Sequence, residues 1–121
     1  MPGMIANIKY VCIYVSDFER SLAFYKEGLG LDVTYHEEHF AQFNTDGTIL
    51  TIEKGGEKSG EPKDFRKNGV LIQFEVEDME KAVGTLKSRN VKFTQDVTEV
   101  EFGKIAMIVD PDGNQLQLLE Q

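Results

Sequence analysis

Residues 108–118 read Ile-Val-Asp-Pro-Asp-Gly-Asn-Gln-Leu-Gln-Leu, two apolar runs on either side of a turn sequence. Pro111 presets φ for the first central position of a turn, and Gly113 tolerates positive φ, so the stretch predicts a hairpin. After the turn, Gln115 and Gln117 alternate with leucines, which places both glutamines on one face of the last strand. A polar face in this position predicts either contact with solvent or the wall of a binding site.

The first half of the chain predicts a strand, a helix and three further strands. Residues 8–15 alternate and are rich in β-formers, and Ser16 and Glu19 have the spacing of a capping box that would start a helix. Gly28 and Gly30 would end the helix, which carries one apolar stripe: Phe18, Leu22, Tyr25 and Leu29. Short strands are then predicted over residues 31–35, 40–44 and 48–54.

The second half of the chain repeats this order after a segment without periodicity. Residues 55–69 are polar and punctuated by glycine, which predicts a linker. A strand is predicted over residues 70–76, and Asp78 is the expected N-cap of a second helix with the stripe Met79, Ala82, Val83 and Leu86. The remaining strands are predicted over residues 91–93, 104–109 and 115–119.

The two halves are an internal repeat. Residues 13–17 (Ile-Tyr-Val-Ser-Asp) recur as residues 74–78 (Phe-Glu-Val-Glu-Asp), and Asp46-Gly47 recurs as Asp112-Gly113. Neither half can cover its sheet alone, and its helix can cover only one face. We therefore expect an α+β fold with one domain over residues 1–121. It would contain two βαβββ modules (5–54 and 70–120), which form a curved mixed sheet around a cleft with the helices on the outer face.

Composition limits the partners and the compartment. The 121 residues carry a net charge of −8, which argues against nucleic acid and anionic membranes as partners. The single cysteine, Cys12, excludes an intramolecular disulfide and fits a reducing compartment. The chain has no run of 18 apolar residues and no basic region at its start, so we expect no membrane span, no signal peptide and a cytoplasmic location.

Several of these motifs together carry a family resemblance. They are Val15-Ser16-Asp17, Ser21-Leu22-Ala23-Phe24-Tyr25, Leu29-Gly30-Leu31 and Asp110-Pro111-Asp112-Gly113-Asn114. With them the chain resembles the glyoxalase/bleomycin-resistance/dioxygenase superfamily, also called vicinal oxygen chelate proteins, over nearly its whole length outside the linker. The resemblance implies the paired βαβββ fold. It leaves the activity open, because one fold can host many chemistries.

The resemblance also implies where a metal would bind. Metal-dependent members place one ligand in each of four strands, and these positions fall here on Tyr10, Thr51, Leu71 and Gln117, or on Glu53 if the alignment shifts by two residues. A divalent cation needs several carboxylate or imidazole donors, and leucine offers none. We therefore expect no metal and no cofactor.

The other reactive side chains have simpler expected roles. His36 and His39 are expected to be exposed histidines around a hairpin. Cys12 has no histidine at a catalytic spacing, so we expect a buried, inert thiol. Asp46 and Asp112 are expected to stabilise their turns through local hydrogen bonds.

Period-two alternation, started from the ligand positions that the resemblance implies, predicts a binding wall without lysine or arginine. Its tyrosines could stack on a planar ligand and its carboxylates could meet a cationic group, although Glu53 and Glu75 could equally be a solvated rim. The predicted ligand-binding residues are Tyr10, Cys12, Tyr14, Thr51, Glu53, Leu71, Gln73, Glu75, Gln115 and Gln117.

Three functions remain open. The first is a metal-free small-molecule-binding protein that sequesters a cationic aromatic compound, as the bleomycin-resistance branch does. The second is a glyoxalase-like lyase, isomerase or dioxygenase with a divergent site, in which Glu53 would act as base and Tyr10 as acid. The third is a domain that offers only an interaction surface. We also expect a homodimer, because both halves expose strand edges and residues 70–76 carry more apolar surface than one helix covers.

Overall fold

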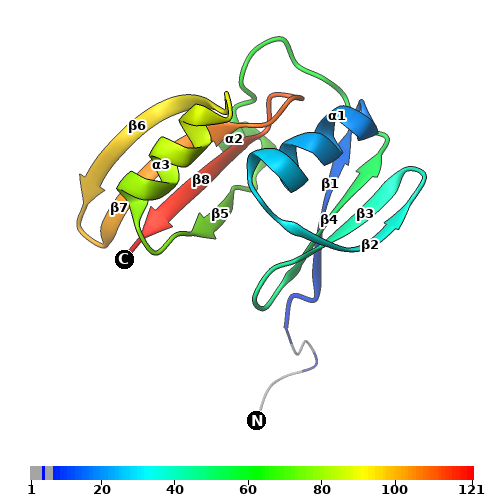
Figure 1. Cartoon of the computed structure of the whole chain (residues 1–121), viewed down its shortest axis with the longest axis horizontal. Coiled ribbons are helices and arrows are strands. Elements are labelled where there is room, and N and C mark those ends of the chain that lie inside the picture. Colours follow the sequence, from blue (N-terminus) through cyan, green and yellow to red (C-terminus); the bar gives the residue numbers. More distant parts are fainter. Residues whose placement is uncertain (1–3, 5–6) are drawn as a thin grey trace. The chain divides into compact units, whose positions relative to one another are not determined.

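The computed structural model describes Met4 and residues 7–121. The expected start of the first module, at residue 5, lies outside the described residues. The chain divides between Glu57 and Lys58 into two compact units (Figure 1). Each unit has one four-stranded mixed sheet, and the order of elements is that of two βαβββ modules, as predicted. No helix among the described residues is long and apolar enough to cross a membrane.

The first module is built on a sheet with the strand order β1-β4-β3-β2. Its strands are β1 (Tyr10–Val15), β2 (Asp32–Glu37), β3 (Phe40–Asn44) and β4 (Ile49–Lys54). β1 pairs parallel with β4, and the other pairs are antiparallel. Between β1 and β2 the chain forms α1 (Phe18–Ala23), which continues as the π-helical turn η1 (Phe24–Gly28).

Helix α1 begins one residue later than the predicted capping box. Asp17 is the N-cap, and its Oδ1 accepts a hydrogen bond from the backbone N–H of Arg20 at 3.2 Å. The prediction of Ser16 as the cap was therefore wrong. Both residue types can cap a helix, and the extended backbone at Asp17 (φ −124°) decides between them.

One face of the first sheet packs against this helical segment. Phe18 and Tyr25 from the predicted stripe are buried, and the Tyr25 ring lies 6.0 Å from the ring of buried Phe43 in β3. The Phe18 ring stacks on His36 of β2 with 5.8 Å between centroids. His36 and His39 are exposed, as predicted. The helix therefore covers one face, and the opposite face is left without a helix.

The second module has the strand order β5-β8-β7-β6, with β5 parallel to β8. Its elements are α2 (Phe65–Asn68), β5 (Ile72–Glu75), α3 (Met79–Ser88), β6 (Lys92–Val100), β7 (Gly103–Val109) and β8 (Gln115–Glu120). Two predictions need correction. The linker contains α2, and β6 runs well past the predicted residues 91–93, because its polar half also pairs with β7, with register shifts between Phe93 and Thr98.

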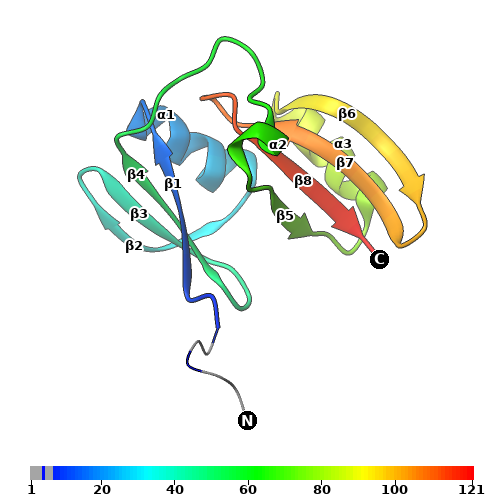
Figure 2. The ribbon, with the colours of Figure 1, turned by 180° about the vertical axis from the view of Figure 1, so that it is seen from behind.

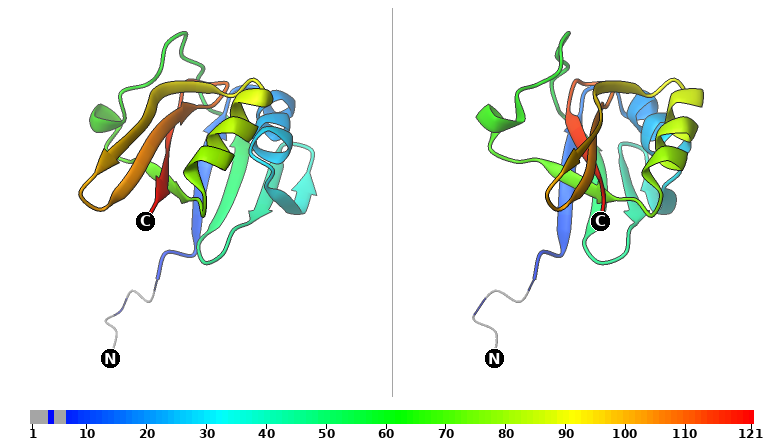
Figure 3. Two further views of the ribbon diagram at one scale, coloured as in Figure 1. Left: turned by 60° about the vertical axis from the view of Figure 1, so that its left-hand side comes forward. Right: turned by 90° about the vertical axis from the view of Figure 1, so that its left-hand side faces the viewer.

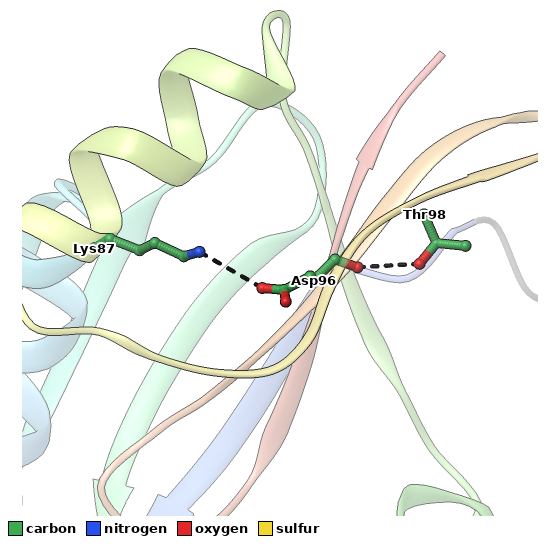
Figure 4. A network of polar contacts seen from close by, with 3 residues as sticks. All are labelled: Lys87, Asp96 and Thr98. Atoms are coloured by element: carbon green, nitrogen blue, oxygen red, sulfur yellow. Dashed lines mark hydrogen bonds and ion pairs between the residues drawn. The ribbon is translucent and has the colours of Figure 1, made fainter.

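Helix α3 is fixed at both ends. Asp78 caps it as predicted, accepting from the N–H of Lys81 at 3.1 Å, and Glu120 Oε1 accepts from the N–H of Met79 at 2.6 Å. Near the other end, Lys87 Nζ lies 3.5 Å from Asp96 of β6, whose carbonyl accepts from Thr98 at 3.1 Å (Figure 4). Both partners of the ion pair are more than half exposed, so it contributes little stability.

The predicted hairpin between β7 and β8 is present and is held by the segment before α2. The N–H groups of Ser59 and Lys63 donate to the carbonyls of Asp112 and Gly113 at 2.9 and 2.7 Å. Within the turn, the carboxylate of buried Asp110 accepts from the N–H groups of Asp112 and Asn114. α3 and α2 lie on opposite sides of this sheet (Figures 2 and 3).

Candidate functional site

The first open face is the side of the first sheet that lies opposite α1. The parallel register pairs Cys12 with Thr51 and Tyr14 with Glu53, so these side chains share a face with Tyr10. Tyr10 and Tyr14 are 52% and 55% exposed, Glu53 is half-buried and Thr51 is buried. The five predicted site residues of the first module therefore lie together on one surface.

Cys12 corrects one prediction. The thiol is exposed, whereas we expected a buried one. β1 is the edge strand of its sheet, so Cys12 has a neighbouring strand on one side only, and no helix covers the face on which it lies.

A row of four side chains crosses the first open face from edge to edge. The register places Tyr14 beside Glu53, Glu53 beside Phe40, and Phe40 beside Glu37. Residues paired across strands point to the same face, so rings and carboxylates alternate along the row. We call Tyr14, Glu53, Phe40 and Glu37 the aromatic–acidic row.

The neighbouring row supports one end of it. Tyr35 follows Cys12, Thr51 and Gln42 in register, and its hydroxyl donates to Glu37 Oε1 at 2.5 Å. The Tyr35 ring lies 6.2 Å from that of Phe40. The hydrogen bond to Glu37, with lesser effects of desolvation and of the carboxylate charge, raises the pKa of Tyr35 above its usual value.

Sequence reasoning missed this half of the face. It took its wall from the first and last strands of each half and did not follow the register across β3 and β2. Tyr35, Glu37, Phe40 and Gln42 were therefore left out. The signal was available, because period-two alternation carried back through the β3–β4 hairpin from Glu53 reaches Phe40.

The second open face is the side of the second sheet opposite α3, and its polar groups bond to one another. Gln73 and Gln117 are register partners, and Gln73 Nε2 donates to Gln117 Oε1 at 2.5 Å. Gln115 Oε1 accepts from Thr94 at 2.7 Å, and Gln115 Nε2 donates to the Lys63 carbonyl at 2.8 Å. The other predicted residues of this half are Leu71, which is partly exposed, and Glu75, which is exposed.

The two open faces belong to separate compact units. The expectation that all ten predicted residues line one cleft therefore stays a prediction. Within the first module, a surface hollow of about 460 Å³ lies where β1 begins. It is lined by Asn7, Ile8, Lys9, Gly47, Thr48 and Ile49. This lining has no carboxylate, so it lacks the chemistry of the aromatic–acidic row.

The residues at the implied metal positions do not fit a divalent cation. Leu71 has no donor atom, Thr51 offers a hydroxyl, and the Gln117 amide already accepts from Gln73. Tyr10 and Glu53 leave one carboxylate in the set, where hard cations need several oxygen ligands and transition metals favour imidazole or thiolate. Among Met4 and residues 7–121, no three His, Cys, Asp or Glu side chains come together as a metal-binding group.

Comparisons with known proteins agree with this fold. An uncharacterized Bacillus subtilis protein, YraH, is 30% identical over 117 residues, covering 88% of this chain and 91% of its own. Metallothiol transferase FosB from Staphylococcus haemolyticus is 27% identical, covering 95% of this chain and 84% of its own. A glyoxalase-related enzyme from Fulvimarina pelagi superposes with a TM-score of 0.75 at 15% identity, covering 97% of this chain and 89% of that one.

The family model described as Glyoxalase/Bleomycin resistance protein/Dioxygenase superfamily matches residues 7–118, which include both modules and the segment between them. This match confirms the resemblance that the sequence motifs indicated. The chain belongs to the glyoxalase/bleomycin-resistance/dioxygenase superfamily.

Proposed function

We propose that this protein binds a small organic cation with an aromatic or amide-bearing body, without a metal and without changing it chemically. The observation that carries the proposal is the aromatic–acidic row, in which two carboxylates alternate with two aromatic rings on a face without a helix. A net charge of −8 adds a long-range attraction for cations.

The expected affinity is modest. A cation over an aromatic ring gains about 0.5–2 kcal/mol, and an exposed ion pair adds about 0–1 kcal/mol. Burial of an aromatic ligand body contributes about 25 cal/mol per Å² of apolar surface. Together these contributions fall short of the roughly 8 kcal/mol that micromolar binding needs, so we expect a dissociation constant of about 0.1–1 mM.

The test compares phenyltrimethylammonium with its neutral isostere tert-butylbenzene, by calorimetry and by the rise in melting temperature. Glu53→Gln should weaken the cation more than the neutral compound, and added salt should weaken the cation as well. Glu80→Gln, on the exposed side of α3, is the control for net charge and should change neither. A preference for anions, or unchanged cation affinity in Glu53→Gln, would refute the proposal.

A second candidate function is a superfamily enzyme with a divergent site, and the FosB relative, named as a metallothiol transferase, favours it. The non-ligating residues at the implied metal positions weigh against its metal-dependent form. We expect purified protein to contain no stoichiometric zinc, nickel, manganese or iron and to keep its melting temperature in a chelator. About one bound ion per chain in elemental analysis would favour the enzyme instead.

We further propose that the protein forms a homodimer. β1 and β5 are edge strands, and Val70, just before β5, is 70% exposed. Pairing of such edges in a twofold dimer would remove open backbone groups and apolar surface from water. Light scattering at tens of micromolar checks this, and a monomer mass there would contradict it.

A further inference from the structure

We propose that the aromatic–acidic row recognises a dication, a ligand with two positive charges on either side of an apolar or aromatic middle. This inference rests on the proposed function and adds the number and spacing of the charges to it. A site with one carboxylate would accept any organic cation. Two carboxylates at a fixed distance would favour ligands whose two positive charges are separated by a matching distance.

The spacing follows from the sheet. Glu53 in β4 and Glu37 in β2 are separated by one strand, β3, and Phe40 lies between them in register. Two neighbouring strand spacings place the two backbone positions about 10 Å apart. The Phe40 ring then lies between the carboxylates, where it can contact the apolar middle of a ligand whose ends meet Glu53 and Glu37.

Neighbouring groups hold the ends of the row in place. Tyr35 donates to Glu37 Oε1 at 2.5 Å, which orients that carboxylate and leaves its other oxygen for a ligand. At the opposite end, a Cβ added at Gly55 would lie 3.5 Å from Tyr14 Cδ1, so the Tyr14 ring lies directly against the backbone there. An oriented acceptor and a supported ring lose less freedom on binding than mobile side chains would.

The row also lacks competing cations of its own. Neither it nor the neighbouring row, which consists of Cys12, Thr51, Gln42 and Tyr35, contains lysine or arginine. Neither ion pair found among the described residues involves Glu53 or Glu37. Both carboxylates are therefore available to positive charges from a ligand.

The experiment measures affinities by calorimetry for a series of bis(trimethylammonium) alkanes bridged by butane, hexane or decane. Hexyltrimethylammonium is the matched monocation. The hexane-bridged dication spans about the distance between the two strands that carry the carboxylates, and the other two are too short or too long. We expect the hexane-bridged compound to bind about three- to tenfold tighter than the monocation and tighter than both other dications.

Substitutions then test which carboxylate binds the second positive charge of the ligand. Glu37→Gln should remove the preference for the dication, whereas Glu53→Gln should weaken both ligands. Glu38→Gln removes the same charge from the adjacent residue, which lies in the β2–β3 turn and pairs with His39 at 3.8 Å, and should keep the full preference.

Two results would overturn the inference. One is equal affinity for dication and monocation once the statistical advantage of two equivalent ends is removed. The other is a dication preference that survives Glu37→Gln. Either result leaves the proposed function standing if the monocation still binds and Glu53→Gln still weakens it. If no cation binds at all, the proposed function fails together with the inference.

Discussion

The two open faces have the same strand topology and different polar side chains. In the first module, Cys12 pairs with Thr51 and Tyr14 pairs with Glu53, and in the second module the equivalent pairs are Gln73 with Gln117 and Glu75 with Leu119. The glutamines of the second face are bonded to each other and to the Lys63 backbone, whereas both tyrosines of β1 are more than half exposed. The two modules therefore share the same strand pairing and differ in the side chains on this face of the sheet.

The difference also involves what lies over each sheet. In the second module α2 is on the side of the sheet opposite α3, and the segment before it bonds to Gln115 and to the β7–β8 turn (Figure 2). In the first module the equivalent turn, before β4, is open at its glycine. A Cβ added at Gly47 in that turn would have no atom of the described residues within 4 Å. The bonded amides and the segment over them fit a structural role for the second face. The exposed rings and carboxylates of the first face are the reason that we propose binding there.

The largest expected effect tests whether the helix-covered faces are equivalent. Ile52 in β4 and Leu118 in β8 are equivalent positions, and both are buried. Ile52→Ala and Leu118→Ala should each lower the free energy of unfolding by about 2–5 kcal/mol, because each leaves a cavity in a packed core. Urea denaturation measures both. A near-neutral result at one position would show that the two cores are not alike.

A smaller effect should separate the two turns. Gly47 and Gly113 both have positive φ, at 98° and 90°, but only Gly113 lies against the covering segment, where an added Cβ would come within 2.8 Å of the Glu61 carbonyl oxygen. Gly47→Ala should cost about 1 kcal/mol of stability for backbone strain, and Gly113→Ala about 2 kcal/mol or more. Equal losses in thermal or urea unfolding would argue that the covering segment is easily displaced.

The smallest expected effect concerns the supporting hydrogen bond of the aromatic–acidic row. The pKa of Tyr35 lies above its usual value of 10.0, chiefly because its hydroxyl donates to Glu37. The stabilisation from this raised pKa is therefore present at neutral pH and is lost as pH rises through the native pKa. Ultraviolet titration should show one phenol with a raised pKa that is absent in Tyr35→Phe. Glu37→Gln should return this pKa toward 10.0, and an unchanged titration would mean that the bond does not form in solution.

The sequence by itself determined the order of the main elements and their division into two modules. Period-two alternation, the Asp78 cap, the turn at Asp110–Asn114 and the internal repeat predicted two βαβββ modules, and the superfamily match confirmed the family. These features are local or periodic, so they can be read without knowing which segments meet. The missing metal donors were visible in the same way, because leucine cannot ligate in any arrangement.

Only the tertiary structure decided which side chains are neighbours. The row from Tyr14 to Glu37 exists because four strands align in one register, and a shift of one residue would turn Glu37 to the other face. The exposure of Cys12, the cap at Asp17 and the segment that holds the β7–β8 turn were likewise settled by packing and long-range hydrogen bonds. Such contacts join residues far apart in the chain, and local patterns carry no information about their distance.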